Sequence, residues 1–215
     1  MTLDEAKIRL IMELRSMGIA DTAVLAAIER VPRAQFVPAK YVDQAYENVA
    51  LPIGEGQTIS QPYVVAYMTE KLELGERMKV LEVGTGSGYQ AAVLAPLCRR
   101  IYTIERQRTL YRAAVQRLAD LGVHNIVARH GDGTEGWPEQ APFDRIIVTA
   151  AASEVPLALV EQLKTDGVMV LPLGPGPINQ ELVRVRRSED GHVIEPLIGV
   201  RFVPLVAGAD DGRVR

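Results

Sequence analysis

The stretch that decides the fold is residues 79–90, which read Lys-Val-Leu-Glu-Val-Gly-Thr-Gly-Ser-Gly-Tyr-Gln. A short, mostly apolar run ends in Gly84, Gly86 and Gly88, and an apolar helical pattern begins directly after them. Glycine has no Cβ and tolerates positive φ, so such a turn lets the backbone approach a ligand closely. The helix behind the turn presents free N–H groups. The stretch therefore predicts a strand, a glycine turn and a helix that together bind a nucleotide-type cofactor.

Downstream of residue 76 the chain alternates between strand and helix patterns. Apolar runs predict strands at 78–83, 100–104, 125–129, 144–150, 167–172, 180–186 and 196–203. Periodic segments predict helices at about 88–97, 107–121 and 154–164. Helices or crossovers join the first four strands, which favours an α/β fold with a doubly wound, mostly parallel, seven-stranded Rossmann-like sheet. The last two strands flank the hairpin-like turn at 188–191 and are therefore predicted to be antiparallel.

The part of the chain before residue 76 has a different pattern. Helices are predicted at 3–17, from Asp21 to Pro32, around Tyr41 to Tyr46 and from Pro62 to Leu72. Residues 49–62 hold two glycines, two prolines and four uncharged polar side chains, which predicts a long ordered loop, a common place for binding residues. We expect one compact domain with three parts: N-terminal helices and a substrate loop at 1–75, a cofactor-binding α/β core at 76–206, and a loose polar tail at 207–215.

Composition argues against several classes of protein. The 215 residues are 47% apolar, enough for one domain with a sizeable core. The net charge of −3 and the pI of about 5.7 argue against a nucleic-acid partner. Apolar runs as long as a membrane span, about 18 residues or more, are absent from the sequence, so we expect no membrane partner.

The cysteine and histidine residues point to an intracellular protein without a metal. The one cysteine, Cys98, follows an apolar helical pattern and is predicted to be a buried structural thiol. The first residues lack the features of a signal peptide, so a cytoplasmic location is expected. His124, His130 and His192 show no metal-ligand spacing. Since no assembly face is evident, we expect a monomer.

Two classes of cofactor fit a glycine turn of this kind. The NAD pattern G-x-G-x-x-G would require glycine where this chain has Tyr89, and that glycine normally permits close packing of helix on strand. The alternative, S-adenosylmethionine, often uses acidic-x-G-x-G-x-G, which Glu82 and the three glycines match, with Thr85 and Ser87 between them. The turn therefore favours S-adenosyl-L-methionine over NAD.

Acidic residues follow the next two predicted strands. Glu105 ends the second strand, 21 positions after Gly84, where a carboxylate can accept hydrogen bonds from both ribose hydroxyls in either cofactor class. Asp132 and Gly133 follow the third strand, where the carboxylate can accept from an adenine amino group and glycine lets the backbone flank the ring. Because the carboxyl ends of parallel strands meet at one edge of the sheet, these residues are expected to form one cofactor site.

These motifs resemble those of class I S-adenosylmethionine-dependent methyltransferases. The residues that carry the likeness are 80–95, Glu105, 131–133 and the segment Asp-Arg-Ile-Ile-Val-Thr-Ala at 144–150. The segment Gln-Thr-Ile-Ser-Gln-Pro at 57–62 and Arg-Phe-Val-Pro-Leu at 201–205 narrow it to the protein-L-isoaspartate O-methyltransferase family. The likeness covers residues 3–206, and the segment Thr-Ile-Ser-Gln-Pro is its most specific part.

The resemblance implies protein repair. Members of this family methylate the free α-carboxylate of L-isoaspartyl residues, and less well the side chain of D-aspartyl residues, in damaged proteins and peptides. The ester closes to a succinimide, whose hydrolysis returns some normal aspartyl linkage. The family's fold carries two additional N-terminal helices and a modified strand order at its C-terminal end.

The resemblance also assigns site residues. The family's active-site serine falls on Ser60, and Thr58, Ile59, Gln61 and Val203 are expected beside the substrate. Where family members often have threonine, this chain has Val206, so no polar role is carried onto it. The acceptor would be a carboxylate, ionised at pH 7, and its methylation needs no general base. A Ser60 hydroxyl that holds this carboxylate beside the methyl group would suffice.

Three other readings stay open at this point. One is a methyltransferase with the same cofactor and another acceptor. The second is an NAD-dependent dehydrogenase, and the third is a sensor of adenosine nucleotides without enzymatic activity.

Overall fold

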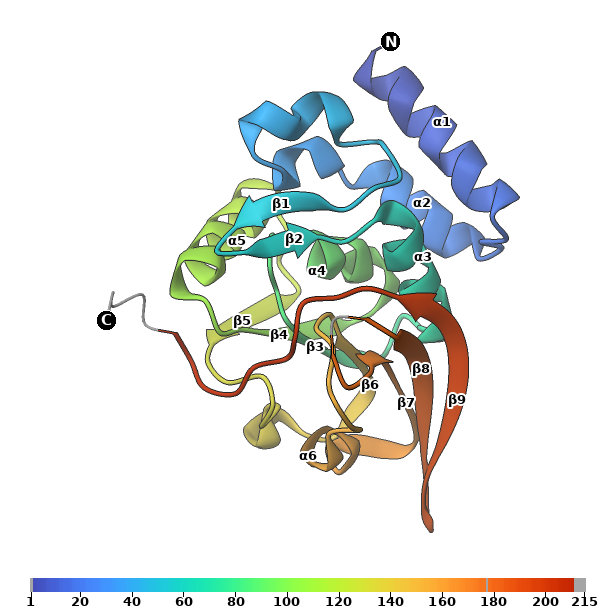
Figure 1. Ribbon diagram of the computed structural model, residues 1–215, viewed down its shortest axis with the longest axis vertical. Helices are drawn as coiled ribbons and strands as arrows, with labels where there is room; N and C mark the ends of the chain where they lie inside the picture. The colour runs from blue at the N-terminus through green and yellow to red at the C-terminus, as the bar shows by residue number, and fades with distance from the viewer. Residues whose placement is uncertain (1, 177, 211–215) are drawn as a thin grey trace.

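A seven-stranded sheet forms the centre of the computed structural model, which describes residues 2–176 and 178–210 (Figure 1). The strands are β3 Lys79–Val83, β4 Arg100–Glu105, β5 Ile126–His130, β6 Phe143–Val148, β7 Leu163–Leu173, β8 Gln180–Ser188 and β9 Gly191–Val200. Their order in the sheet is β5-β4-β3-β6-β7-β8-β9. The neighbours from β5 to β7 are parallel, and β8 and β9 are antiparallel. The predicted fold class is confirmed.

Helices cover both faces of the sheet, as its buried apolar strands require. The core helices and 3₁₀ turns are α4 Tyr89–Leu94, η3 Ala95–Leu97, α5 Arg108–Asp120, η4 Pro138–Gln140 and α6 Leu157–Val160. On one face α3 (Pro62–Lys71) and α4 bury Met68, Leu72 and Leu94 against the central strands. On the other face α6 buries Leu159 and Val160.

The N-terminal segment packs on top of this core. Its elements are α1 Leu3–Ser16, α2 Thr22–Arg30, η1 Arg33–Phe36 and η2 Ala39–Gln44. The side chains of Thr2 and Asp21 cap the first two helices, each accepting from backbone N–H groups of the first turn. Leu10, Leu14 and Phe36 share a buried cluster with Tyr89 and other residues of α4 and α5.

Residues 49–62 differ from the predicted ordered loop. They contain a two-stranded antiparallel sheet of β1 Leu51–Gly54 and β2 Gln57–Ile59. Leu51 and Ile59 pair in register and are both buried, while Glu55 and Gly56 make the turn at positive φ. The β1–β2 hairpin lies above α4 in the view of Figure 1, and Cδ1 of Ile53 in β1 is 3.6 Å from the position of a Cβ on Gly86.

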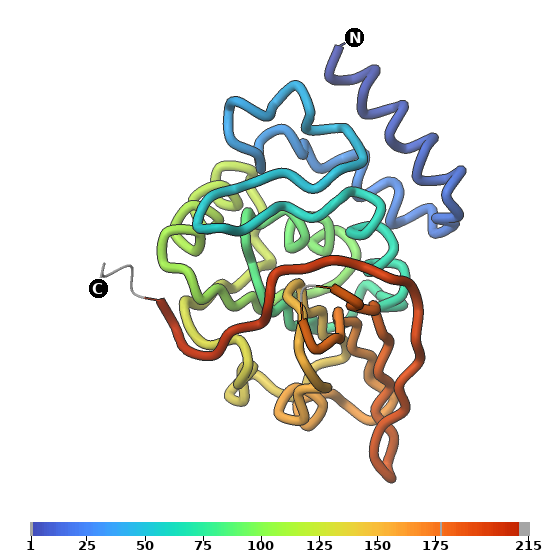
Figure 2. The backbone as a smooth tube through the Cα atoms, viewed as in Figure 1, coloured from blue at the N-terminus to red at the C-terminus, as the bar shows by residue number. Residues whose placement is uncertain are grey.

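Two further boundaries were predicted wrongly. The helix expected at 154–164 is the single turn α6, because Pro156 starts it and the long strand β7 already begins at Leu163. The last strand runs over 191–200 rather than 196–203, since its pairing with β8 begins at the Ser188↔Gly191 turn. Beyond Val200 the chain leaves the sheet and crosses the molecule below the β1–β2 hairpin (Figure 2).

The end of the chain is anchored as far as it is described. Gly208 accepts from the Arg106 side chain, and the carbonyl of Asp210 lies 3.2 Å from Nε2 of His130. Residues 211–215 of the tail predicted to be loose lie outside the described residues.

Cys98 is buried, as predicted, and burial raises the pKa of its thiol to about 12. Within residues 2–176 and 178–210, no group of three His, Cys, Asp or Glu side chains could hold a metal ion. None of the helices in the described part of the chain has the length and apolar character needed to cross a membrane.

Candidate active site

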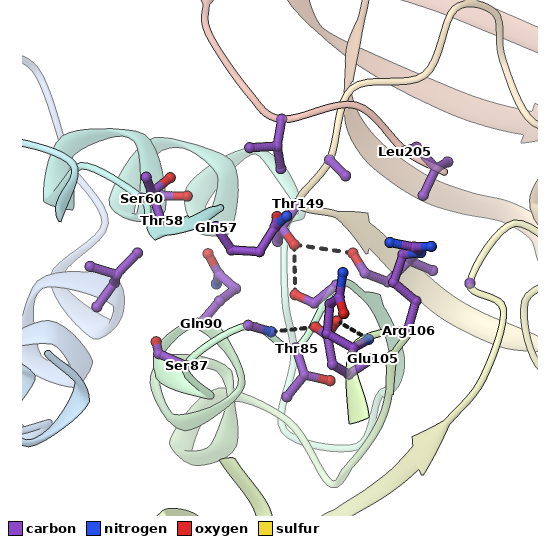
Figure 3. A pocket seen from close by; sticks show the side chains of 18 of the residues that line it. Gln57, Thr58, Ser60, Thr85, Ser87, Gln90, Glu105, Arg106, Thr149 and Leu205 are labelled. Atoms are coloured by element: carbon purple, nitrogen blue, oxygen red, sulfur yellow. Dashed lines mark hydrogen bonds between the residues drawn. The ribbon is translucent and has the colours of Figure 1, made fainter. Parts of the chain in front are cut away.

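A cleft opens where β3, β4 and β6 end, between the β1–β2 hairpin and the segment that follows β9 (Figure 3). It holds about 950 Å³ of empty space, including the part open to solvent. Of the residues assigned to the cofactor from the sequence, those on its wall are Gly84, Thr85, Gly86, Ser87, Glu105 and Gly133. The site thus lies at the point where the strand order reverses, the usual ligand site of such a sheet.

The glycine turn is shaped by contacts that leave no space for a side chain. Gly84 has φ +96°, and a Cβ there would lie 2.3 Å from Oγ1 of Thr149. That hydroxyl donates to the Gly84 carbonyl at 2.6 Å. A Cβ on Gly133 would lie 2.5 Å from Cγ1 of Val83. Backbone at both positions therefore forms the wall against which a cofactor can lie.

Gly88 has a different role from the other two glycines of the turn. It caps α4 with φ +89°, and a Cβ on it would point at Ala114 and Leu118 of α5, 3.4 Å away. Gly88 is not one of the described residues that line the cleft. Gly88 therefore permits close helix packing, and the predicted direct cofactor contact does not fit its position.

Glu105 lies at the centre of the cleft floor. Its carboxylate accepts from the backbone N–H groups of Gly86 and Gln107, both at 2.8 Å (Figure 3). The side chain is 5% exposed. A carboxylate can accept about four hydrogen bonds, so it retains acceptor positions for a diol such as a ribose. The position agrees with the role predicted from the sequence.

Glu82 lies beneath the turn and is not one of the described residues that line the cleft. It is fully buried, and its Oε2 accepts from the Thr103 hydroxyl at 2.6 Å. That hydroxyl lies 2.6 Å from the hydroxyl of Thr85 in the turn. Oε1 has no hydrogen-bond partner in the described structure. The predicted direct contact of Glu82 with the cofactor therefore does not fit this placement, and Glu82 supports Thr85 instead.

The buried Glu82 predicts a pH dependence of stability. Burial, with a smaller contribution from the charge of Glu105, raises the pKa of its carboxyl from 4.5 to about 8, although the Thr103 hydroxyl opposes this shift. The folded state therefore holds the proton more tightly than the unfolded state, and the free energy of unfolding falls as pH rises from 4.5 to 8. The side chain of Glu82→Gln is neutral at every pH, so this variant should not show the decrease in the free energy of unfolding. Thermal melts between pH 4.5 and 8 test this, and the exposed Glu29→Gln variant is the control. If the stability of Glu82→Gln fell with pH as steeply as that of the wild type, the prediction would be contradicted.

Asp132 is turned away from the cleft. One carboxylate oxygen accepts from the backbone N–H and hydroxyl of Thr134 at 2.8 and 2.7 Å, and the other accepts from Gly208 N–H at 2.5 Å. Burial raises the pKa of this carboxyl, but these hydrogen bonds outweigh it and the net shift is downward. Gly133 lines the cleft, whereas Asp132 does not. In this conformation the carboxylate anchors the C-terminal segment, and the predicted adenine contact would use its remaining acceptor capacity.

A second groove joins the cleft beside Ser60. It runs between the start of α3 and the end of β9, and Gln61, Tyr63, Ile198 and Arg201 are among its lining residues. The four residues that line both the cleft and the groove are Thr58, Ser60, Thr149 and Val203. Ile59 lines the cleft alone. All the predicted acceptor-side residues are therefore brought together around the junction of the two spaces.

The Ser60 side chain is half-buried, and its hydroxyl has no hydrogen bond to any residue that the structure describes. Gln61 caps α3 without a side-chain hydrogen bond, and Pro62 is the first helical residue. The alternative role of Ser60 as a helix cap is therefore excluded. Its hydroxyl is available to a ligand at the junction.

The sequence matches known proteins over nearly the whole chain. The family model described as protein-L-isoaspartate(D-aspartate) O-methyltransferase matches residues 5–210. The chain belongs to this family. A relative from Paramagnetospirillum magneticum, a protein-L-isoaspartate O-methyltransferase, is 64% identical over 202 residues, which are 94% of each chain. The family predicted from the Thr-Ile-Ser-Gln-Pro segment is confirmed.

Solved structures agree with the isoaspartyl methyltransferase fold. One protein-L-isoaspartate O-methyltransferase superposes with a TM-score of 0.84 at 28% identity, covering 92% of this chain and 65% of its own. A putative family member from Plasmodium falciparum, solved with S-adenosyl-L-homocysteine, has a TM-score of 0.80 at 24% identity. The match covers 92% of this chain and 97% of the Plasmodium chain.

Several described residues of the two walls were not among the site residues predicted from the sequence, and three of them make hydrogen bonds that shape the candidate site. Thr149 closes the glycine turn and lines both spaces. Gln90 lines the cleft and donates to Thr69 at 2.9 Å. Gln180 lines the groove and binds the backbone of Phe202 from both sides, accepting from its N–H at 2.6 Å and donating to its carbonyl at 3.1 Å. Of the three, Thr149 has the clearest signal in the sequence, because it lies at the end of the fourth predicted strand.

The contacts of Gln180 predict a selective effect on the acceptor. Gln180→Ala removes both hydrogen bonds to Phe202, which precedes Val203 at the junction. Loss of buried hydrogen bonds costs about 1–3 kcal/mol, so KM for an isoaspartyl peptide should rise about 5- to 150-fold. The affinity for S-adenosylhomocysteine should change little. Steady-state kinetics and calorimetry test this, and an unchanged peptide KM would contradict it.

Proposed function

We propose that this chain uses the Ser60 junction to transfer a methyl group from S-adenosyl-L-methionine to the free α-carboxylate of L-isoaspartyl residues, and less well to D-aspartyl residues, in damaged proteins. The activity follows from the family, and the roles of individual residues are the proposal. The observation that carries these roles is that Thr58, Ser60, Thr149 and Val203 border both the cleft and the groove. A donor in the cleft and a peptide in the groove would meet there.

The cleft residues suit S-adenosylmethionine. Gly84 and Gly133 offer bare backbone where a Cβ would collide with Thr149 or Val83, and Glu105 keeps acceptor positions for ribose hydroxyls. Bound there, S-adenosylmethionine supplies a methyl group already activated by its sulfonium. The polypeptide then has to orient the acceptor and exclude water, which can contribute on the order of 7–11 kcal/mol.

Ser60 orients the acceptor in this proposal. An acceptor carboxylate is already ionised at neutral pH, so no side chain has to remove a proton. The Ser60 hydroxyl donates a hydrogen bond to one carboxylate oxygen and leaves the other free to attack. Gln61 and Val203 flank the peptide in the groove, where its backbone can be recognised whatever its side chains are.

We further infer that the enzyme acts as a cytoplasmic monomer made of one compact domain. The buried cluster that joins Leu10 and Phe36 of the N-terminal segment to Tyr89 and Leu118 of the core supports a single folding unit. The single, buried Cys98 suits a reducing compartment. Light scattering with size-exclusion chromatography tests the monomer, and a dimer mass at micromolar concentration would contradict it.

Titration calorimetry with S-adenosylhomocysteine and NAD tests the cofactor assignment. S-adenosylhomocysteine should bind at one site per chain, and NAD should not bind. Binding of NAD alone would contradict the proposed use of the cleft. The Glu105→Ala variant should bind S-adenosylhomocysteine with lower affinity, since it lacks the carboxylate proposed to face the ribose.

A further inference from the structure

Arg33 is a fully buried cation behind the site, 0% exposed. Its guanidinium donates to three backbone carbonyls: from Nε to Ala45 at 2.9 Å, and from Nη2 to Ser60 at 2.8 Å and Val49 at 3.4 Å. These carbonyls belong to three separate segments: the end of η2, the approach to β1, and the link between β2 and α3. One side chain thus connects the N-terminal segment to the residue at the junction.

The charge of Arg33 is not neutralised by a carboxylate in the described structure. Its guanidinium carbon lies 4.7 Å from the ring centroid of Tyr89, a buried residue of the cleft wall. Nη1 of Arg33 and the hydroxyl of Tyr89 have no hydrogen-bond partner among the residues described. Burial lowers the pKa of Arg33, although the neighbouring Tyr89 and Tyr46 oppose this shift.

Such a residue is poorly explained by stability alone. A buried charge without an ionic partner is costly, and buried ionic groups can often be replaced by apolar residues with little or no loss of stability. The planar guanidinium does offer one arrangement that no apolar side chain can: N–H groups aimed at several carbonyls at once. One of these carbonyls is that of Ser60, so the guanidinium holds the backbone at the junction.

We propose that Arg33 is a positioning residue for methyl transfer, which fixes the direction of the Ser60 hydroxyl by holding the Ser60 carbonyl. The inference rests on the proposed role of Ser60. Arg33 does not line the cleft or the groove, so it acts through the Ser60 backbone rather than on the acceptor itself.

Two substitutions and a matched control separate positioning from folding. Arg33→Lys keeps the charge but cannot span the three carbonyls, and Arg33→Met removes both. The control is Arg145→Lys, because Arg145 also donates to backbone carbonyls, those of Leu72 and Glu73, but lies outside the cleft and the groove. For each variant, turnover is expressed per chain that binds S-adenosylhomocysteine, so that unfolded chains do not count.

In Arg33→Met, kcat/KM for an isoaspartyl peptide should fall about 10- to 100-fold, the scale of a misplaced reacting group, and Arg33→Lys should recover part of this loss. The affinity for S-adenosylhomocysteine should stay within about twofold of the wild type in both. Arg145→Lys should keep the wild-type kcat/KM. Wild-type kcat/KM in Arg33→Met, or loss of S-adenosylhomocysteine binding in both Arg33 variants, would overturn the proposal.

A double-mutant cycle with Ser60→Ala shows whether Arg33 acts through the hydroxyl. If it does, Arg33→Lys should have a much smaller effect on kcat/KM in a Ser60→Ala background than in the wild type. Effects that multiply independently would overturn the positioning role while leaving the role of Ser60 intact. No effect of Ser60→Ala alone would instead refute the proposed function of Ser60.

Discussion

Replacing Gly84 with alanine is expected to abolish binding of S-adenosylmethionine. The new Cβ would lie 2.3 Å from Oγ1 of Thr149, and the backbone φ of +96° is one that alanine rarely adopts. Either the glycine turn or Thr149 has to move, and Thr149 is held by its hydrogen bond to the Gly84 carbonyl. Calorimetry with S-adenosylhomocysteine should show an affinity lower by more than about 100-fold, on the scale of 3 kcal/mol or more.

Two further variants separate the collision from simple backbone strain. Gly122→Ala also places alanine at positive φ, but the nearest atom to its Cβ is Nε2 of His124 at 3.9 Å, so it should lose stability and keep cofactor affinity. In Gly84→Ala with Thr149→Ala the colliding hydroxyl is gone, and part of the affinity should return. Wild-type affinity in Gly84→Ala would show that the cofactor does not depend on this turn.

Replacing Ser60 with alanine is expected to lower turnover about 10- to 150-fold. A hydrogen bond from a hydroxyl to a charged acceptor contributes roughly 1.5–3 kcal/mol, and about 1.4 kcal/mol corresponds to a factor of ten in rate. The loss should affect turnover of the isoaspartyl peptide and leave S-adenosylhomocysteine binding unchanged. The fold should tolerate the change, because the Ser60 hydroxyl binds none of the described residues.

The matched control for Ser60→Ala is Ser188→Ala, which removes an exposed serine hydroxyl from the end of β8. It should keep wild-type kinetics. Wild-type turnover in Ser60→Ala would refute the role of the hydroxyl, and an equal loss of cofactor affinity would place Ser60 in the cofactor cleft alone.

The parts of the fold that could be predicted from the sequence are those with local signals. The strand, turn and helix at 79–90 are such a case, because the glycines occur where the backbone takes positive φ. Glu105 is another, since the end of a parallel strand fixes the position of its carboxylate at the sheet edge. Ser60 was found through the resemblance of its segment to a family.

The parts that could not be predicted depend on contacts between distant segments. The β1–β2 hairpin was missed because its strands are short and contain Pro52 and Gly54. Glu82 belongs to the expected motif, yet the pattern does not reveal that its side chain points down to Thr103 rather than into the cleft. The two hydrogen bonds of the Gln180 side chain to the Phe202 backbone join residues 22 positions apart. No spacing in the sequence indicates this contact.

The central claim is that the groove selects an isoaspartyl carboxylate for methylation at the Ser60 junction. The most direct test is transfer of labelled methyl from S-adenosylmethionine to two peptides that differ only in one isoaspartyl or normal aspartyl linkage. The wild type should label the isoaspartyl peptide and leave its aspartyl twin unlabelled, and Ser60→Ala should slow this labelling. Equal labelling of the two peptides, or of neither, would contradict the claim.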